Sequence, residues 1–214
     1  MKNLTKVLLI TLLTVLTTSS AAQHGVGVCG GLNLSNFSAN DLQEVRYHNR
    51  LTYAVGGVLD IQLTKNFVLH LQPVYMQKGS KVKLSGREGL STLAYFELPV
   101  LLRYALGKSA FYMRYHNRRQ VYLVAGPTVG FLVSNESSND IEIIDNAKNF
   151  DFGISFGAGI SLPLPGNKTL FVEGRYSRGL INIKDDSDIP GTELRTRGIQ
   201  ILAGLCFLIP SFAD

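Results

Sequence analysis

The chain has 214 residues, with 21 Lys and Arg against 16 Asp and Glu, which gives a formal net charge of +5. That basic excess is too small and too scattered for a dedicated nucleic-acid binder, and two cysteines are too few for a disulfide-built scaffold. After the first 22 residues no apolar stretch reaches about 18 residues, which excludes a helical membrane protein.

Residues 1–22 have the layout of a secretory signal peptide. Two lysines precede the apolar run Val7–Leu16, and the small residues of Ser20–Ala22 come before Gln23. An N-terminal membrane anchor is the alternative, but the run is shorter than the roughly 20 residues that a spanning helix needs. We therefore expect export, cleavage before Gln23 and one mature domain over 23–214. Removing two lysines from 21 basic residues leaves 19 against 16 acids, or +3.

Eight stretches of the mature chain alternate between apolar residues and small or polar ones, which is the pattern of a β-strand with two different faces. In chain order the predicted strands are Val26–Ser35, Thr52–Leu63, Phe67–Gln77, Thr92–Tyr104, Gln120–Ser134, Asn149–Leu162, Thr169–Arg178 and Thr196–Phe207. Most reach the about 9–11 residues of a transmembrane β-strand. The fifth has two apolar faces, so the sequence leaves open which of them meets lipid.

The connections between these strands alternate in length. Four are long and polar: Asn36–Arg50, Gly79–Ser91, Asn135–Lys148 and Gly179–Arg195. Thr64–Asn66 and the segment around Pro163 are short, and Ala105–Arg119 is intermediate. Outer-membrane barrels have short periplasmic turns and long external loops. The predicted fold is therefore all-β: an eight-stranded antiparallel up-and-down transmembrane β-barrel, whose closure removes exposed strand edges.

The alternation also predicts which polar residues point into the barrel. An eight-stranded barrel is just wide enough to be filled by side chains, so inward glycines would make room for long polar residues. The predicted lumen polar network comprises Asp60, His70, Glu97, Arg103, Asp151, Glu173 and Arg175, and Gln72, Lys78 and Gln200 are also predicted inward. The best candidates for paired charges are Glu97 and Arg103 on the fourth strand, with Glu173 and Arg175 on the seventh. A polar pore or ligand site is one interpretation, and eight strands favour the other, a filled barrel held by ion pairs.

Cys29 and Cys206 fall on the first and last predicted strands, which must be neighbours if the barrel closes. Both are predicted to point inward. A disulfide could form between them in the oxidising periplasm if their Cα atoms lie within about 7 Å. The alternative is that two small residues simply fill the lumen.

Other candidate sites are weak. The four histidines lack metal-ligand spacing, and no Gly-rich phosphate loop or nucleophile elbow occurs. Asp185, Asp186 and Asp188 could bind Ca²⁺, but a solvated acidic loop is favoured. We expect no cofactor, no metal and no catalysis, although spacing alone leaves a barrel enzyme acting on lipids or peptides open.

Several motifs occur in a specific order along the mature chain: GGLNLSNF (30–37), PVYMQKGS (73–80), YFELPVLLRY (95–104), VYLVAGPTVGFLVS (121–134), FGISFGAGI (152–160) and EGRYSRGLINI (173–183). With these motifs the chain resembles the PorT-like outer-membrane β-barrel proteins of Bacteroidetes, often called porin family proteins. The resemblance implies the barrel fold and an outer-membrane location. It implies no reaction and transfers no catalytic residue.

The predicted function is that of an integral outer-membrane β-barrel protein with a structural, interaction or limited passive transport role. Its expected partners are outer-membrane lipid and, through the four long external loops, other proteins. We expect no nucleic-acid partner and a monomeric state. The alternative is a secreted, soluble, lipocalin-like barrel that binds a small apolar ligand. That alternative requires an apolar lumen and a polar exterior.

Overall fold

A computed structural model of the chain describes residues 24–39, 46–84, 87–106, 119–138, 148–182 and 194–209, so the predicted signal peptide lies outside the described residues. The described part forms one sheet, with the strands β1 (His24–Ala39), β2 (Arg46–Gln62), β3 (Phe67–Leu71), β4 (Val74–Leu84), β5 (Arg87–Leu106), β6 (Gln120–Ser138), β7 (Phe150–Leu164), β8 (Lys168–Gly179) and β9 (Leu194–Ile209). It contains no helix of sufficient length and apolar character to cross a lipid bilayer.

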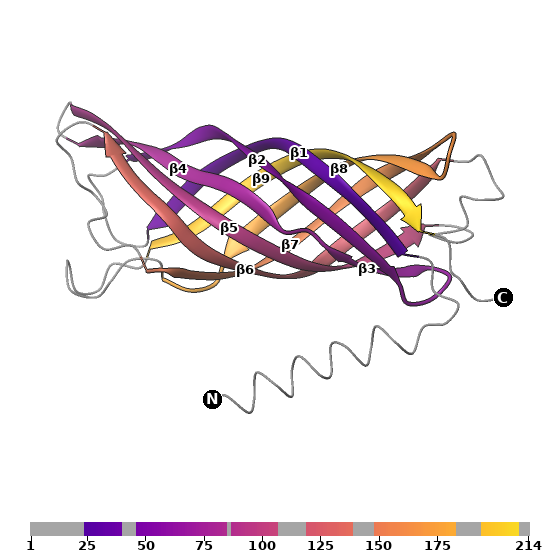
Figure 1. The fold of residues 1–214 in the computed structure, drawn as a ribbon. Helices are drawn as coiled ribbons and strands as arrows, with labels where there is room; N and C mark the ends of the chain where they lie inside the picture. Colours follow the sequence, from indigo (N-terminus) through magenta and orange to yellow (C-terminus); the bar gives the residue numbers. More distant parts are fainter. Residues whose placement is uncertain are drawn as a thin grey trace.

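The sheet closes on itself into a barrel of tilted strands (Figure 1). Every pairing between strands is antiparallel, and β1 pairs with both β2 and β9, which seals the wall. Strands β3 and β4 together fill one place between β2 and β5, so the wall has eight strand positions. Closure leaves no unpaired edge along the wall. The predicted eight-stranded antiparallel barrel is confirmed.

The third predicted strand, Phe67–Gln77, is interrupted at Gln72 and Pro73, which separate β3 from β4. Pro73 has no N–H group and cannot donate to a ladder hydrogen bond. The neighbouring strands hold the break in place. Gly57 N–H donates to the Pro73 carbonyl oxygen at 2.9 Å, and Gln72 N–H donates to the Pro99 carbonyl oxygen at 3.2 Å.

Several strands are longer than predicted at the end of the barrel that carries the long connections. The prediction of a loop over Gly79–Ser91 is wrong, because β4 runs on to Leu84 and pairs with β5 down to Arg87. Strands β1, β2 and β6 also continue into predicted loops. A strand that has left the lipid needs no apolar outer face, so the ladder continues where the alternation stops. Segments 40–45, 85–86, 107–118, 139–147 and 183–193 of the predicted connections lie outside the described residues.

The outer wall of the barrel is apolar. Exposed large apolar side chains occur along its strands, and Val28, Leu51 and Ile201 have relative exposures of 64%, 62% and 59%. The inner side carries Asp, Glu, Arg, Lys, His and Gln side chains that are all buried. The lipocalin-like alternative requires the reverse arrangement, so these faces exclude it.

The structure also shows which face of the fifth predicted strand meets lipid, a question that the sequence left open. In β6, Val121, Leu123 and Phe131 are exposed on the outer wall, whereas Tyr122 and Val124 are buried inside. On β5 the alternation would place Ala94 on the outer wall with Phe96, but Ala94 is only 4% exposed. It lies beside the shift of the β5–β6 register between Ala94 and Tyr95.

Two glycines make room for large rings inside the barrel. Gly159 on β7 is the direct cross-strand partner of Tyr122 on β6. Gly204 on β9 is the direct partner of Cys29 on β1 and of Phe171 on β8. A Cβ atom at either glycine would lie only 2.4 Å from the ring of Tyr122 or Phe171, respectively. Small residues therefore admit the aromatic rings that line the lumen, as expected for a narrow barrel.

Candidate functional site

All seven residues of the predicted lumen network are buried inside the barrel. Their relative exposures are 4% for Asp60, 0% for His70, 3% for Glu97, 7% for Arg103, 3% for Asp151, 1% for Glu173 and 3% for Arg175. Together with Lys78, which is 7% exposed, they form two clusters. We call Asp60, His70, Arg103, Glu173 and Arg175 the turn-side cluster, because β2 and β3, which carry Asp60 and His70, meet there in a short turn. Lys78, Glu97 and Asp151 form the loop-side cluster, nearer the long connections.

The first half of the turn-side cluster is built around the carboxylate of Asp60. Arg103 Nη1 lies 3.0 Å from Asp60 Oδ2, and Asp60 Oδ1 contacts His70 Nδ1. Arg103 Nη2 is also 3.0 Å from His70 Nδ1. These three side chains come from β2, β3 and β5, so one carboxylate joins three adjacent strand positions.

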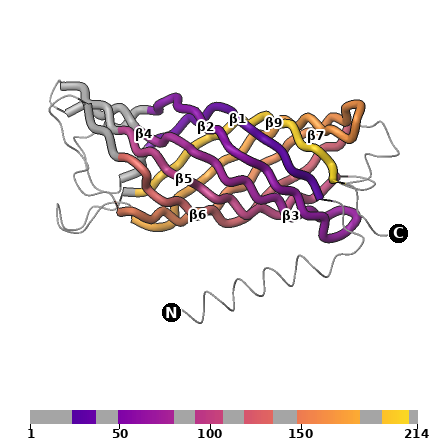
Figure 2. Tube along the Cα trace, in the orientation of Figure 1, coloured from indigo at the N-terminus to yellow at the C-terminus, as the bar shows by residue number. Residues whose placement is uncertain are grey.

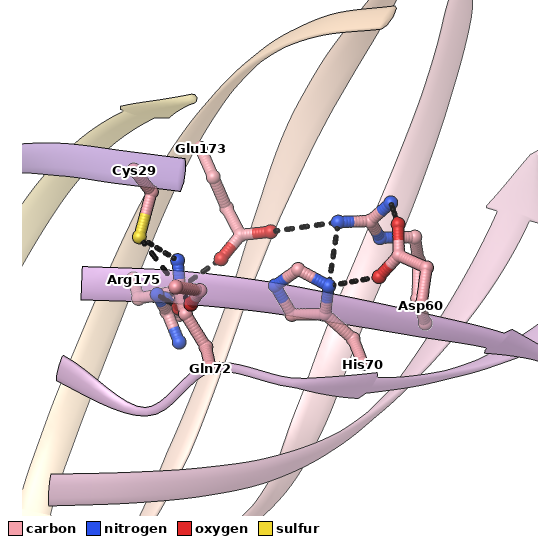
Figure 3. A network of polar contacts seen from close by, with 8 residues as sticks. Cys29, Asp60, His70, Gln72, Glu173 and Arg175 are labelled. Atoms are coloured by element: carbon pink, nitrogen blue, oxygen red, sulfur yellow. Dashed lines mark hydrogen bonds and ion pairs between the residues drawn. The ribbon is translucent and has the colours of Figure 1, made fainter. Parts of the chain in front are cut away.

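The second half of this cluster continues across the lumen. Glu173 Oε1 forms an ion pair with Arg175 Nε at 2.7 Å, and Glu173 Oε2 lies 4.0 Å from Arg103 Nη2. Arg175 Nη2 donates to Gln72 Oε1, and Gln72 Nε2 lies 3.1 Å from Cys29 Sγ. In Figure 3 the Glu173 carboxylate lies between the group at Asp60 and His70 and the group at Arg175, Gln72 and Cys29.

The contact between Arg175 and Gln72 spans the full width of the barrel. Gln72 lies in the break between β3 and β4, and Arg175 lies on β8. The path from β8 to β3 takes four steps in one direction (β9, β1, β2, β3) and four in the other (β7, β6, β5, β3). These residues are therefore on opposite sides of the wall, and their side chains meet in the middle of the lumen.

The rings admitted by the glycines pack on the turn-side cluster. The guanidinium carbon of Arg103 lies 4.3 Å from the centroid of the Tyr122 ring and 5.8 Å from that of Phe171. A guanidinium over an aromatic face gains a cation–π interaction, which is stronger away from water. Arg103 is thus held by two acids and two rings at the centre of the barrel.

The loop-side cluster has a simpler plan, with one cation between two carboxylates. Lys78 Nζ lies 2.9 Å from Asp151 Oδ2 and contacts Glu97 Oε1. Thr196 Oγ1 donates to Asp151 Oδ2 at 3.1 Å, and Lys78 Nζ lies 5.1 Å from the centre of the Tyr95 ring. These contacts join β4, β5, β7 and β9 across the lumen.

The structure brings some of the predicted partners together and separates others. Glu173 and Arg175 form an ion pair. Glu97 and Arg103 lie in different clusters, where Glu97 binds Lys78 and Arg103 binds Asp60. The sequence placed Lys78 on the inner face but did not single it out. The alternation that places His70 and Gln72 on the inner face continues past the break at Pro73 and places Lys78 there too.

The two cysteines are buried and both thiols are free. The disulfide considered from the sequence is therefore absent from the structure. Cys29 is opposite Gly204 and Cys206 is opposite Gly27, so the two cysteines are diagonal neighbours on β1 and β9. Diagonal neighbours are separated by about 7–8 Å, beyond the usual Cα separation of a disulfide. Both thiols instead pack with the apolar side chains of the lumen.

No group of three or more His, Cys, Asp or Glu side chains in the described part of the chain is arranged to hold a metal ion. Asp185, Asp186 and Asp188 lie outside that part. Tyr53 and Tyr104, which lie near the ends of predicted strands, are exposed on the outer wall.

Comparison with known proteins gives one family and a set of similar folds. A family model described as "Outer membrane protein beta-barrel domain" matches residues 20–185. No curated protein matches the chain. The outer membrane protein OprG from Pseudomonas aeruginosa is similar, with a TM-score of 0.66 at 12% identity, covering 89% of this chain and 97% of that one.

Two further solved structures have lower scores. Neisserial surface protein A has a TM-score of 0.48 at 12% identity, covering 85% of this chain and 96% of that one. The N-terminal β-barrel domain of OprF from Pseudomonas aeruginosa has a TM-score of 0.42 at 13% identity, covering 85% and 97%. At these identities the likeness concerns the fold alone, and we rely only on OprG for it.

Proposed function

The chain belongs to the family of outer membrane protein beta-barrel domains, and from that premise we propose that it works as a filled barrel whose lumen is closed to hydrated solutes. It is an integral protein of the outer membrane, with an apolar wall toward lipid. The proposal concerns what the barrel does there. It holds a rigid platform in the membrane and presents the ends of its long connections outside.

The observation that carries this proposal is the contact of Arg175 with Gln72 across the whole width of the lumen. A second crossing, from Lys78 on β4 to Asp151 on β7, lies nearer the long connections. Side chains that meet in the middle of a narrow barrel leave no continuous column of water between them. Their hydrogen bonds and ion pairs also compensate the charges, which would be unfavourable if buried alone.

With the lumen occupied, we assign the specific interactions of the protein to its long external connections. Binding residues are concentrated on loops held by a rigid scaffold. The proposed role is therefore structural or interactive, with at most limited passive transport and no catalysis. A monomer suffices for this role, because the barrel closes within one chain.

The test is electrical conductance in planar lipid bilayers. We expect the wild-type protein to give no stepwise conductance. We expect steps only when both crossings are removed, by Arg103→Ala and Arg175→Ala in the turn-side cluster together with Lys78→Ala, Glu97→Ala and Asp151→Ala in the loop-side cluster. Regular steps from the wild type would refute the filled lumen. Heat-dependent migration on gels, unchanged between the two proteins, would show that both are folded barrels.

Two finer assignments from the sequence are part of the proposal. We place the chain among the PorT-like barrels of Bacteroidetes because its ordered motifs resemble theirs, and we propose that residues 1–22 are removed as a signal peptide. The intact mass of the protein purified from outer membranes should correspond to a chain that begins at Gln23. A mass that includes residues 1–22 would contradict the cleavage.

A further inference from the structure

The outer wall changes from apolar to polar within one step of the ladder near the long connections. The strands β2, β1, β9 and β8 are consecutive in the wall, and the first three are labelled in Figure 2. On these strands one row of outward residues is Leu51, Leu34, Ile199 and Tyr176. Two residues farther toward the long connections, the corresponding row is the exposed Asn49, Arg197 and Arg178 and the buried Asn36, which binds Asn49. This boundary is where the rows of apolar outward residues end on these four strands.

Two arginines stand next to each other in the polar row. Arg178 on β8 and Arg197 on β9 are direct cross-strand partners, and both are exposed on the outer wall. Like charges directly opposite each other destabilise a sheet unless something compensates them. No hydrogen bond or ion pair joins either guanidinium group to another residue in the described part of the chain.

Among the side chains that the structure describes, the outer wall offers these arginines no carboxylate. Four acids have side chains that the structure describes, namely Asp60, Glu97, Asp151 and Glu173, and all four point into the lumen with exposures of 4% or less. The surroundings of Arg178 are instead apolar. Its partner on β7 is Ile154, and Leu180 lies two residues farther along the chain, each 44% exposed.

We propose that Arg178 and Arg197 form a binding site for the phosphate group of a lipid in the outer leaflet. The long connections of outer-membrane barrels face outward, so this end of the apolar belt is at the outer leaflet. A guanidinium group can bind two phosphate oxygens at once, and two adjacent guanidinium groups suit one phosphate. The apolar row below them would contact the acyl chains of the same lipid. This site is independent of whether the lumen conducts.

The experiment measures lipid binding to the full-length mature protein in detergent micelles by native mass spectrometry. The probes are diphosphorylated lipid A and the same lipid without its phosphates. We expect Arg178→Gln with Arg197→Gln to weaken binding of the phosphorylated lipid at least tenfold, and to leave binding of the dephosphorylated lipid unchanged. Arg119→Gln with Lys168→Gln removes two exposed positive charges at the other end of the barrel, and this control should bind like the wild type.

Three further measurements distinguish other sources of the binding. Arg178→Lys with Arg197→Lys keeps both charges but loses the geometry that binds two phosphate oxygens at once. The affinity of this variant for the phosphorylated lipid should therefore lie between those of the wild type and the Gln variant. Inorganic phosphate should not displace the lipid at equal concentration, and displacement would indicate a site for the free ion. Asp185→Asn, Asp186→Asn and Asp188→Asn together should leave binding unchanged, because a tenfold increase would make those acids the partners of the arginines. Equal binding by the wild type and the Gln variant would overturn the proposal, provided that both migrate as folded barrels.

Discussion

The two clusters of the lumen both compensate buried charges, but they do so with different numbers of partners. In the turn-side cluster two arginines face two carboxylates, with His70 and Gln72 as additional partners. In the loop-side cluster a single cation, Lys78, holds two carboxylates. One cluster shares its contacts among many groups, whereas the other depends on one side chain.

This difference predicts how each cluster responds when a residue is removed. Loss of one partner leaves a buried charge uncompensated, which is far more destabilising than replacement of a whole ion pair by apolar groups. The loop-side cluster should therefore be the more sensitive of the two, although it is smaller and nearer the long connections.

The largest effect is expected for Lys78→Met. Glu97 and Asp151 would then face each other without a cation, and the free energy of unfolding should fall by about 3–5 kcal/mol. Urea unfolding in lipid vesicles, followed by the change in gel mobility, measures this. The triple variant Lys78→Met, Glu97→Gln and Asp151→Asn removes the uncompensated charges and should recover much of the loss. A single variant as stable as the wild type would show that Lys78 is not the centre of this cluster.

A smaller loss, about 2 kcal/mol, is expected for Arg103→Met, since hydrogen bonds to charged groups contribute on that order. Arg175 still pairs with Glu173, and His70 still contacts Asp60. His70→Gln added to this variant should increase the loss, because Asp60 then loses a second partner. The urea unfolding described for Lys78→Met measures both. A loss for Arg103→Met alone that equals the loss for Lys78→Met would contradict the shared design of this cluster.

Gly159→Ala tests the packing that supports Arg103. The new methyl group would meet the ring of Tyr122 at 2.4 Å, and overpacking of this kind costs about 1–3 kcal/mol. Gly174→Ala is the matched control, because a Cβ atom there has no neighbour within 4 Å. Both stabilities can be read from the same unfolding curves, and equal values for the two variants would mean that the ring moves aside freely.

The smallest effect is expected for Tyr95→Phe in the loop-side cluster. The Tyr95 hydroxyl is buried and has no hydrogen-bond partner in the described part of the chain, whereas its ring keeps the contact with Lys78. Removing an unsatisfied buried hydroxyl should change stability by no more than about 1 kcal/mol, toward greater stability. A clear loss would reveal a partner for this hydroxyl and a second support for the cluster.

Much of this architecture could be predicted from the alternation of residues along the strands. The inner and outer faces follow from it, because one face must suit lipid and the other a crowded polar lumen. The partners inside could not be predicted in the same way. Glu97 and Lys78 share a level with Asp151 only because the tilt and stagger of the closed sheet bring β4, β5 and β7 together there. Alternation in one strand contains no information about that stagger.

The positions at which the strands end could not be predicted from the alternation either. The wall continues past the lipid into polar segments such as Gly79–Leu84, where neither face needs to be apolar. The break in the third strand had a visible signal in Pro73, but the apolar alternation on both sides of it concealed the interruption.

The native cysteines allow the most direct test of the filled lumen. Cys29 and Cys206 are 4% and 3% exposed inside the barrel, so a charged, water-soluble thiol reagent should not react with either in the folded protein in lipid vesicles. After unfolding in urea without a reductant, both thiols should react, because they are free. Rapid reaction of the folded protein would show a water-filled lumen and would contradict the account.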